Sequence, residues 1–463
     1  MTLIKSISGI RGTIGGKTNE ALTPLDIVKF TSAFGARIIL RGDNKKVVIG
    51  RDARPSGPMI TDLVSSTLQG LGMDVINLGL STTPTVEIAV PLEKAGGGII
   101  ITASHNPEQW NALKLLNHQG EFISAKDGAE LLTIAASDSI EYAPIESLGK
   151  VETRDDYLQI HIDKILELPW VNQDAIAQAR FKIALDAVKS SGEIAVPMLL
   201  EALGVSTISS IYGEPNGIFP HNPEPLPENI KQICKEVGEG DFDLGIVVDP
   251  DVDRLALVCE DGAPFGEEYT IVAVADYLLN KQPGNTVSNL SSSRALKDVT
   301  ERHGGKYFAS AVGEVNVVRK MKEVDALIGG EGNGGVILPA LHYGRDALVG
   351  IALILSHLAV SGMSLSKLRK QYPNYVISKN KIELNPELDI DMILTRIQER
   401  YQEYPINTED GVKIEFENEW IHLRKSNTEP IIRIYAESQN EVQANKLANE
   451  IIDNINNITA YKV

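Results

Sequence analysis

A chain of 463 residues with 43% hydrophobic residues has room for about three domains with large cores, which excludes intrinsic disorder. Its 44 Lys+Arg against 62 Asp+Glu give a formal charge of −18, which argues against nucleic-acid or anionic-membrane partners. No apolar run reaches the ~18 residues that a membrane-spanning helix needs, and the first residues lack the apolar core of a secretory signal. Cys234 and Cys259 cannot form a disulfide framework, so we expect a cytoplasmic protein.

The first third of the chain alternates short β-branched runs with helical patterns. We expect strands at 46–50, 75–79 and 98–102, and a helix at 57–71. This order is typical of a mostly parallel sheet with helices on its faces.

The same order of elements returns twice more along the chain. The expected elements are strands at 181–186, 244–248 and 325–329, and helices at 193–203, 269–279 and about 346–360. Each time, a buried strand leads into an unusual polar loop. Ligands of open α/β sheets bind beyond the carboxyl ends of strands, so these loops are the candidate functional regions.

The last stretch differs in its pattern. From about 375 it predicts strand, helix, strands and helix, after a linker at 371–374. Val412, Ile414 and Phe416 alternate as in a strand, and the apolar positions from 444 to 455 recur at helical spacing. We expect a smaller α+β domain here.

The first polar loop is 102–107, Thr-Ala-Ser-His-Asn-Pro. Ser104 follows a buried strand, so its hydroxyl could act as a nucleophile or carry a phosphoryl group, although the same residues also suit a plain turn. The loop lacks a Gly-x-Ser-x-Gly elbow, which disfavours an acyl-transfer hydrolase. Lys114, shortly downstream, could supply positive charge or move a proton.

The second loop carries three carboxylates, Asp249, Asp251 and Asp253. In an extended chain these side chains point to one side, where they repel unless a cation joins them. Hard ions such as Mg²⁺ prefer oxygen ligands of this kind. Apolar strands bracket the cluster, which disfavours a solvated acidic turn, and Pro250 and Arg254 disfavour an EF-hand loop.

The third loop, 329–335, has five glycines in seven positions. Such a segment lets backbone approach a ligand closely, while Glu331 and Asn333 offer hydrogen-bonding groups that suit a polyol such as a sugar. A flexible turn is the alternative. No Lys-Ser/Thr follows, so it is not a Walker loop.

The fourth loop is 424–430, followed by a strand at 431–435. It concentrates hydrogen-bond donors that suit a phosphate, which favours an anion-binding cradle over a surface turn. These donors are Arg424, Ser426, Asn427, Thr428 and Arg433.

Together these stretches resemble the α-D-phosphohexomutase family, which includes phosphoglucomutase, phosphomannomutase and phosphoglucosamine mutase. The resemblance spans the chain from Ser-Gly-Ile-Arg-Gly at 8–12 to the Arg424 loop. It implies three similar mixed-sheet α/β domains plus a smaller C-terminal α+β domain around a central active-site cleft. The expected domains are 1–150, with the phosphoserine loop, 151–254, with the metal loop, 255–370, with the sugar loop, and 375–463, with the phosphate loop.

The resemblance also implies a role for each matched residue. The metal site would hold one Mg²⁺ through Ser104, Asp249, Asp251 and Asp253, with Ser104 carrying a phosphoryl group. The catalytic residues would be Ser104, Lys114, Arg11 and His105. The substrate-binding residues would be Arg254, Glu331, Asn333, Arg424, Ser426, Asn427, Thr428 and Arg433.

The implied reaction interconverts hexose 6-phosphate and hexose 1-phosphate through a phosphoserine and a bisphosphorylated sugar. Hexose 1,6-bisphosphate would therefore serve as intermediate and activator. The partner would be a small phosphosugar, with no nucleic acid and no membrane, and the protein would be a monomer or homodimer.

The chain differs from the family's usual sequence motifs at three places. Asn-Ala stands at 111–112 instead of Asn-Gly, and Pro250 and Val252 replace glycine spacers in the metal loop. In the sugar loop, Asn333 and Gly335 stand where many members carry Ser and His. Another residue must then take any proton-transfer role of that histidine, and His342 is the nearest candidate. The alternative is that His342 is a loop histidine without a role.

The sugar is the least defined part of the prediction. The Gly-Asn-Gly-Gly motif at 332–335 most resembles the motif of bacterial enzymes assigned as phosphoglucosamine mutases. The alternative is a phosphoglucomutase/phosphomannomutase. Two other classes remain possible: a phosphatase with an aspartate nucleophile at 251–253, and a non-catalytic sugar-phosphate binder.

Overall fold

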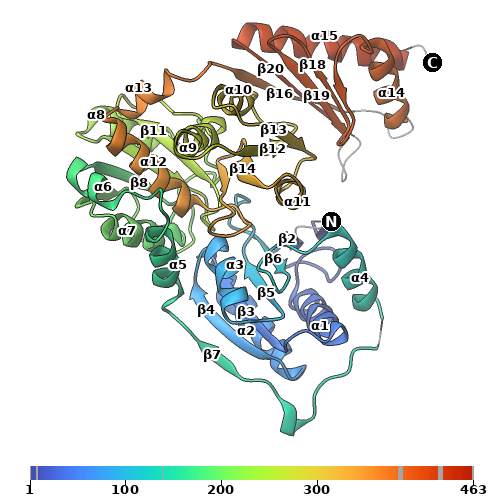
Figure 1. The fold of residues 1–463 in the computed structure, drawn as a ribbon. Helices are drawn as coiled ribbons and strands as arrows, with labels where there is room; N and C mark the ends of the chain where they lie inside the picture. Colours follow the sequence, from blue (N-terminus) through green and yellow to red (C-terminus); the bar gives the residue numbers. More distant parts are fainter. Residues whose placement is uncertain (1, 7–8, 138, 384–388, 426–430, 461–463) are drawn as a thin grey trace.

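The structure, a computed structural model, describes residues 2–6, 9–137, 139–383, 389–425 and 431–460. The strands in these ranges form four sheets, and helices pack on them to give three α/β domains and a smaller C-terminal α+β domain (Figure 1). The predicted fold class is confirmed. None of the helices in the described ranges has the length and apolarity needed to cross a bilayer.

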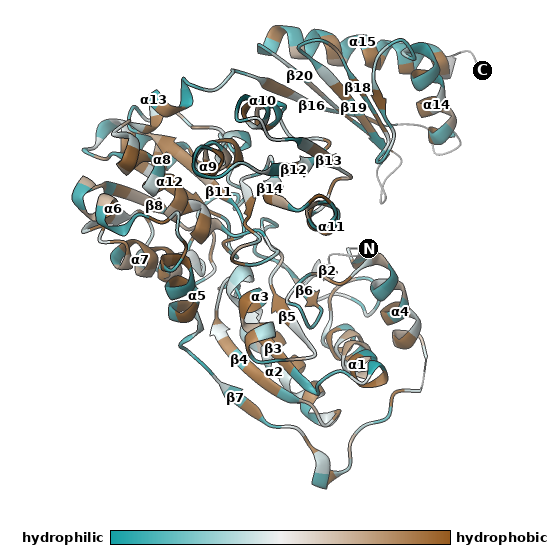
Figure 2. Cartoon of the chain, viewed as in Figure 1, coloured by the Kyte–Doolittle hydropathy of each residue, from teal (hydrophilic) through white to brown (hydrophobic). Residues whose placement is uncertain are grey.

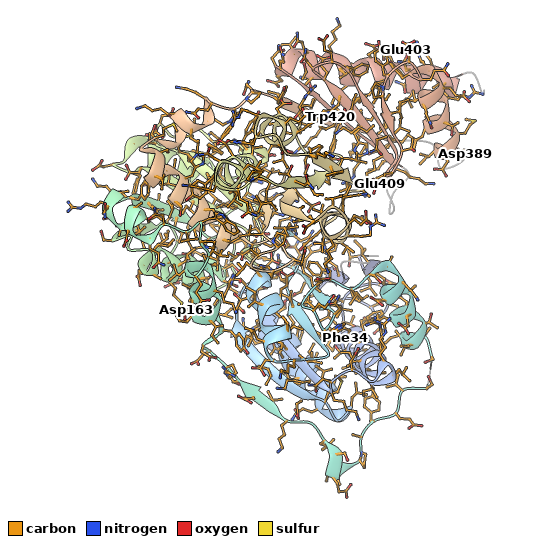
Figure 3. The ribbon with its side chains drawn as sticks, viewed as in Figure 1. Phe34, Asp163, Asp389, Glu403, Glu409 and Trp420 are labelled. Atoms are coloured by element: carbon orange, nitrogen blue, oxygen red, sulfur yellow. The ribbon has the colours of Figure 1, made fainter. Side chains whose placement is uncertain are left out.

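The first domain surrounds a sheet whose described strands follow the order β1-β2-β6-β5-β3-β4-β7. Strands β3 and β5 are largely hydrophobic (Figure 2) and pair in parallel at its centre. Phe34 of α1 is fully buried in this domain's core (Figure 3). The elements are β1 (Ile4–Ser6), β2 (Gly9–Thr13), α1 (Pro24–Arg41), β3 (Lys46–Arg51), α2 (Gly57–Gly70), β4 (Asp74–Leu80), α3 (Thr83–Leu92), β5 (Gly97–Ile101), β6 (Trp110–Leu116), α4 (Ala125–Ala135), a 3₁₀ turn (Ile145–Ser147) and β7 (Val151–Thr153).

The second domain has a sheet in the order β11-β10-β8-β9. Its elements are α5 (Tyr157–Leu166), α6 (Gln173–Ala179), β8 (Lys182–Asp186), α7 (Gly192–Ala202), β9 (Thr207–Ser210), α8 (Lys231–Glu239), β10 (Leu244–Val248) and β11 (Leu255–Cys259). Because β7 and β11 join the sheets that precede them, the sheets extend to 153 and 259. The domain limits at 150 and 254 stay a prediction.

The third domain has a sheet in the order β13-β12-β14-β15. It shares one hydrophobic core with the second domain. The apolar helix α12 lies in this shared core, which explains why its sequence is hydrophobic on nearly every face. The elements are α9 (Glu268–Lys281), β12 (Asn285–Asn289), α10 (Ala295–Arg302), β13 (Tyr307–Ser310), α11 (Glu314–Val324), β14 (Ala326–Glu331), β15 (Gly335–Ile337), α12 (Ala347–Ser361) and α13 (Leu365–Arg369).

The fourth domain has an antiparallel sheet in the order β16-β20-β19-β18-β17 and a core of its own. The apolar stripe of α15 faces that core, as the sequence predicts. Glu409 lies on the side of this domain that faces α11 (Figure 3), where its carboxylate is 3.5 Å from Arg319. The elements are β16 (Val376–Glu383), α14 (Ile390–Arg400), β17 (Ile406–Asn407), β18 (Val412–Glu415), β19 (Trp420–Lys425), β20 (Ile431–Ser438) and α15 (Glu441–Ala460).

One local arrangement recurs in the three α/β domains. Strands β5, β10 and β14 each end in a polar loop, and each loop leads into an antiparallel partner, β6, β11 or β15. The three loops are the phosphoserine, metal and sugar loops of the sequence prediction. Since each loop lies beyond the carboxyl end of a buried strand, the fold places them where α/β sheets bind ligands.

Candidate active site

Ser104 lies at the turn between β5 and β6. Its backbone has a left-handed φ of 48°, which turns the chain away from the strand direction. Its amide donates to the Thr102 hydroxyl at 2.9 Å, and its own hydroxyl donates to Asp249 Oδ2 at 2.8 Å. The serine loop of the first domain therefore contacts the acidic loop of the second.

Arg54 holds the serine loop by its backbone carbonyls, a role that the sequence did not predict. Its fully buried guanidinium donates to the carbonyls of Ser104 and Asn106, each at 2.6 Å, and to two further carbonyls of the same loop. Its Nε donates to Asp52 Oδ2 at 3.0 Å, which balances the charge. A planar guanidinium with several donors suits this task better than a lysine. The signal in the sequence was a charged pair, Asp52 and Arg54, just past a buried strand.

The three aspartates converge, although the chain between them is not extended. The segment turns instead of staying extended, with Val252 in a left-handed conformation at φ 62°. One carboxylate oxygen from each of Asp249, Asp251 and Asp253 lies within 4.8 Å of the others. The turn is held from outside, since the Ser190 hydroxyl donates to the Pro250 carbonyl at 2.7 Å.

The acidic cluster fits a divalent cation. All three aspartates are fully buried, and the Oδ1 atoms of Asp251 and Asp253 have no hydrogen-bond partner in the described residues. Buried carboxylate oxygens without partners are costly, whereas a hard cation would bind them through oxygen. The cluster is therefore able to hold a metal ion.

Lys114 partly balances this charge. Its Nζ donates to Asp251 Oδ2 at 2.7 Å and lies 3.4 Å from Asp253 Oδ2. Burial alone would lower the pKa of Lys114, but the two carboxylates raise it above its ordinary value. Burial and the neighbouring carboxylates raise the pKa of Asp249, whereas Arg345 and Lys114 outweigh burial and hold that of Asp253 low. The same cluster thus contains one carboxylate that resists ionisation and one that stays ionised.

The sugar loop lies directly against the metal loop. Gly334 has a φ of 87°, and a Cβ at this position would lie 2.5 Å from the Leu255 carbonyl, so only glycine allows the contact. Glu331 Oε1 accepts from Asn289 at 2.8 Å and from the Gly313 amide at 3.2 Å. Its carboxylate is therefore held in one orientation.

Arg345 is a second residue that the sequence analysis missed. Its side chain is 9% exposed, and it donates to Asp253 Oδ2 at 2.7 Å and to Glu331 Oε2 at 2.9 Å. It therefore links the metal loop with the sugar loop. The available signal was an arginine immediately before Asp346, the N-cap residue of α12.

Two adjoining cavities, of about 620 and 390 Å³, connect these loops. Their shared lining includes His105, Arg254, Glu331 and Arg345. The larger cavity is also lined by Arg11, Ser104 and Lys114, and the smaller one by Asn333, Arg424 and Arg433.

Three basic or titratable residues line the larger cavity together with Ser104. Arg11 donates to the Asn106 side chain at 2.9 Å, and Arg254 pairs with Glu224 at 3.2 Å. Burial, reinforced by Arg254 and Arg11, lowers the pKa of His105 to about 2, so its imidazole is neutral. Its Nδ1 lies 3.5 Å from the Ser104 hydroxyl.

The fourth domain contributes two arginines from paired strands. Arg424 of β19 lies opposite Arg433 of β20, and both line the smaller cavity. Asp410 pairs with Arg424 at 2.7 Å and holds its guanidinium. Ser426, Asn427 and Thr428, the other expected cradle residues, lie outside the described residues.

His342 lies away from both cavities. It lies 3.3 Å from Glu87 on one side and 3.3 Å from Asp346 on the other, and Asp346 Oδ2 also accepts from His161 Nε2 at 2.9 Å. These four residues come from three domains, and the two carboxylates lie at ion-pair distance from the two imidazoles. His342 therefore belongs to a domain junction and not to the lining of the candidate site.

Comparisons with known proteins define the class. Four family models match: phosphoglucomutase/phosphomannomutase α/β/α domain I at 3–141, domain II at 159–262, domain III at 266–375 and the C-terminal domain at 383–454. Two solved structures share the fold over 98% of the chain: a phosphoglucomutase/phosphomannomutase family protein from Burkholderia thailandensis (TM-score 0.83, 23% identity, 98% of that chain) and a putative phosphomannomutase from Thermus thermophilus (0.82, 25%, 99%). The matched domains and the fold are those of a phosphohexomutase.

Curated relatives match over almost their whole length. A phosphoglucomutase/phosphomannomutase of Thermococcus kodakarensis is 35% identical over 440 residues (94% of this chain, 95% of the relative). A probable phosphoglucosamine mutase of Methanopyrus kandleri is 33% identical (96% of each), and a phosphoglucosamine/phosphogalactosamine mutase of Sulfurisphaera tokodaii is 31% identical (96% and 97%). The chain belongs to the phosphoglucomutase/phosphomannomutase family and is an isomerase of the phosphotransferase type.

Proposed function

We propose that this chain interconverts hexose 6-phosphate and hexose 1-phosphate, with Ser104 as the carrier of the transferred phosphoryl group. The observation that carries the proposal is the contact between the Ser104 hydroxyl and Asp249, at 2.8 Å, inside a cluster of three buried carboxylates. A phosphoryl group on that oxygen would lie beside an ion bound by the cluster and face a cavity lined by basic side chains. Phosphoryl transfer depends mainly on such positioning and charge neutralisation.

The proposed cofactor is one Mg²⁺ held by Asp249, Asp251 and Asp253 together with the seryl phosphate. When bound, it would neutralise phosphoryl charge and help the seryl oxygen leave. Lys114 and Arg11 would lie beside the phosphoryl group in flight. The protonated Lys114 amine is suited to give a proton to the seryl oxygen as the O–P bond breaks. The substrate hydroxyl forms the new O–P bond and passes its proton to an oxygen of the transferred phosphoryl group, from which Lys114 regains the proton that it gave.

Two transfers with a turn of the sugar between them give the net reaction. The first yields a hexose 1,6-bisphosphate, and the second returns the other phosphoryl group to Ser104. One cradle must therefore hold either phosphate, and Arg424 and Arg433 of the fourth domain are placed to do so. The separate hydrophobic core of this domain supports a movement that would let the sugar turn without release.

The proposed sugar substrate is glucosamine phosphate. Names of several relatives support it, including the probable phosphoglucosamine mutase of Methanopyrus kandleri. Glucose and mannose phosphates are the second candidate, favoured by the phosphoglucomutase/phosphomannomutase of Thermococcus kodakarensis at 35% identity.

The direct test is a comparison of kcat/KM for glucosamine, glucose and mannose 1-phosphates, with product identified by NMR. The proposal expects isomerisation of at least one sugar phosphate, with glucosamine phosphate highest, and no isomerisation by Ser104→Ala. Net release of inorganic phosphate as the main product would instead indicate a phosphatase. Tight binding with no product from any of the three would indicate a binding protein.

A further inference from the structure

Arg345 forms ion pairs with three carboxylates at the candidate site. Besides Asp253 and Glu331, its Nε lies 3.1 Å from Glu314 Oε2, and its backbone amide donates to Glu314 Oε1 at 3.1 Å. The guanidinium therefore faces three buried carboxylates. A side chain held at three points has little freedom to move, so it can act as a template for the groups it touches.

The side chain of Arg345 occupies space that another residue would otherwise fill. A Cβ on Gly335 would lie 2.4 Å from Arg345 Cδ and 3.0 Å from its Cγ. The backbone of Gly335 does not have a positive φ, so any residue could adopt its conformation. Glycine is therefore required at 335 by the space that the Arg345 stem takes and not by the backbone.

This packing determines what Glu331 can still bind. A carboxylate has about four acceptor sites. Asn289 and the Gly313 amide use Oε1, and Arg345 uses one site of Oε2. Glu331 lines both cavities, so its remaining capacity is available to a ligand there.

We propose that Arg345 is a positioning residue for the sugar: it fixes Glu331 in the orientation that accepts hydrogen bonds from substrate hydroxyls, and Gly335 leaves room for it. Arg345 and Gly335 thus form one functional unit that takes the place of a larger side chain in the sugar loop. The inference rests on the proposed function, because it assigns Glu331 to sugar binding. His342, the other nearby basic residue, is held between Glu87 and Asp346 and reaches neither cavity.

The first test compares Arg345→Lys with Arg345→Ala. We expect each to lower kcat/KM by about 100-fold, because a sugar misplaced by about 1 Å reacts that much more slowly. Lysine keeps the charge that the buried carboxylates need, so it keeps the fold measurable if alanine does not. Added guanidinium should restore part of the kcat of Arg345→Ala without changing its melting temperature, a result that a purely structural role would not produce.

The second test is a double-mutant cycle between Arg345 and Gly335. Gly335→Ala should lower kcat/KM in the wild-type background, since the new methyl group displaces the Arg345 stem, and should have little further effect beside Arg345→Ala. Gly70→Ala is the matched control, because its Cβ would meet nothing closer than 3.6 Å. Additive losses in the cycle would show that the two positions act independently and would overturn the proposal.

A binding measurement separates this inference from the proposed function. Calorimetric titration of glucose 6-phosphate should show weaker binding to Arg345→Lys than to the wild type, whether or not the sugar turns over. Wild-type binding without isomerisation would defeat the proposed function alone. Equal affinity and equal kcat/KM for wild type and Arg345→Lys would defeat the Arg345 inference alone.

Discussion

The Ser104 hydroxyl donates a hydrogen bond of 2.8 Å to Asp249, across 145 residues of sequence and a domain boundary. Neither domain alone contains both the proposed phosphoryl carrier and the metal ligands. In the proposed mechanism, activity depends on the contact between the first two domains, which Thr83 reinforces by donating to Asp251 Oδ2 at 2.6 Å.

Metal removal should abolish isomerisation, and Mg²⁺ should restore it. The three buried carboxylates are unfavourable without a cation, so Mg²⁺ at 100 times its Kd should stabilise the fold by about 2.7 kcal/mol. Asp251→Asn should weaken Mg²⁺ binding by at least about 100-fold and lose the melting shift. Asp261→Asn, an exposed residue, is the control. Full turnover in EDTA would contradict the metal role.

Replacing Arg54 should slow phosphoryl transfer without preventing substrate binding in the cavity. Arg54→Lys keeps the charge but loses the planar set of donors that holds the Ser104 and Asn106 carbonyls. We expect kcat to fall by about 100-fold, because the Ser104 hydroxyl loses its alignment. Arg51→Lys, at the end of β3 and three residues before Arg54, is the comparison. Equal kcat for both variants would show that Arg54 does not position the serine.

Arg424→Ala should weaken the binding of both hexose phosphate isomers to the same extent. If one cradle holds either phosphate, the KM for the 1-phosphate and for the 6-phosphate should each rise roughly 10- to 100-fold, as expected for hydrogen bonds to a charged group. Lys425→Ala, whose amine pairs with Asp391 outside the cavities, should leave both unchanged. A rise confined to one isomer would mean separate phosphate sites.

The junction around His342 should make stability sensitive to alkaline pH. Burial alone would lower the pKa of His342, but Asp346 and Glu87 raise it to about 10. The stabilising contribution is complete below the ordinary pKa of about 6.5 and is lost as the pH rises through 10. His342→Gln should cost roughly 3–5 kcal/mol at neutral pH and show a flatter pH profile.

The control for this junction is His357→Gln, a half-buried histidine that stacks on Tyr277 instead of bridging carboxylates. Melting curves of all three proteins between about pH 6.5 and 10 provide the comparison. Parallel profiles for wild type and His342→Gln would show that His342 does not carry this dependence.

The sequence predicts the parts of this protein whose signals are local. Strand-to-loop transitions around Ser104, Asp249 and Glu331 are visible in a few consecutive residues, because a buried strand followed by polar or glycine residues has little other explanation. The repeated domain order follows from the same pattern. The turn at Val252 was not predicted, because a Pro-Asp-Val sequence gives no indication that the valine backbone adopts a left-handed conformation.

Arg54 and Arg345 could not be assigned from sequence, because their roles exist only through distant contacts. Arg345 meets Asp253 across 92 positions, and Arg54 meets the Ser104 carbonyl across 50. Gly335 illustrates the same limit: the sequence shows a missing histidine, whereas the structure shows the arginine stem that fills the space. His342 was the nearest alternative along the chain, yet it faces a domain junction.

The most direct test of the account is a single-turnover transfer from Ser104. Protein loaded with labelled phosphate from hexose 1,6-bisphosphate is mixed with glucosamine 6-phosphate and Mg²⁺, and the label is followed by intact mass and peptide mapping. We predict that label leaves position 104 as an equal amount of labelled bisphosphate forms, and that Ser104→Ala takes up none. Label on an aspartate, released by hydroxylamine, or wild-type turnover by Ser104→Ala would contradict the central claim.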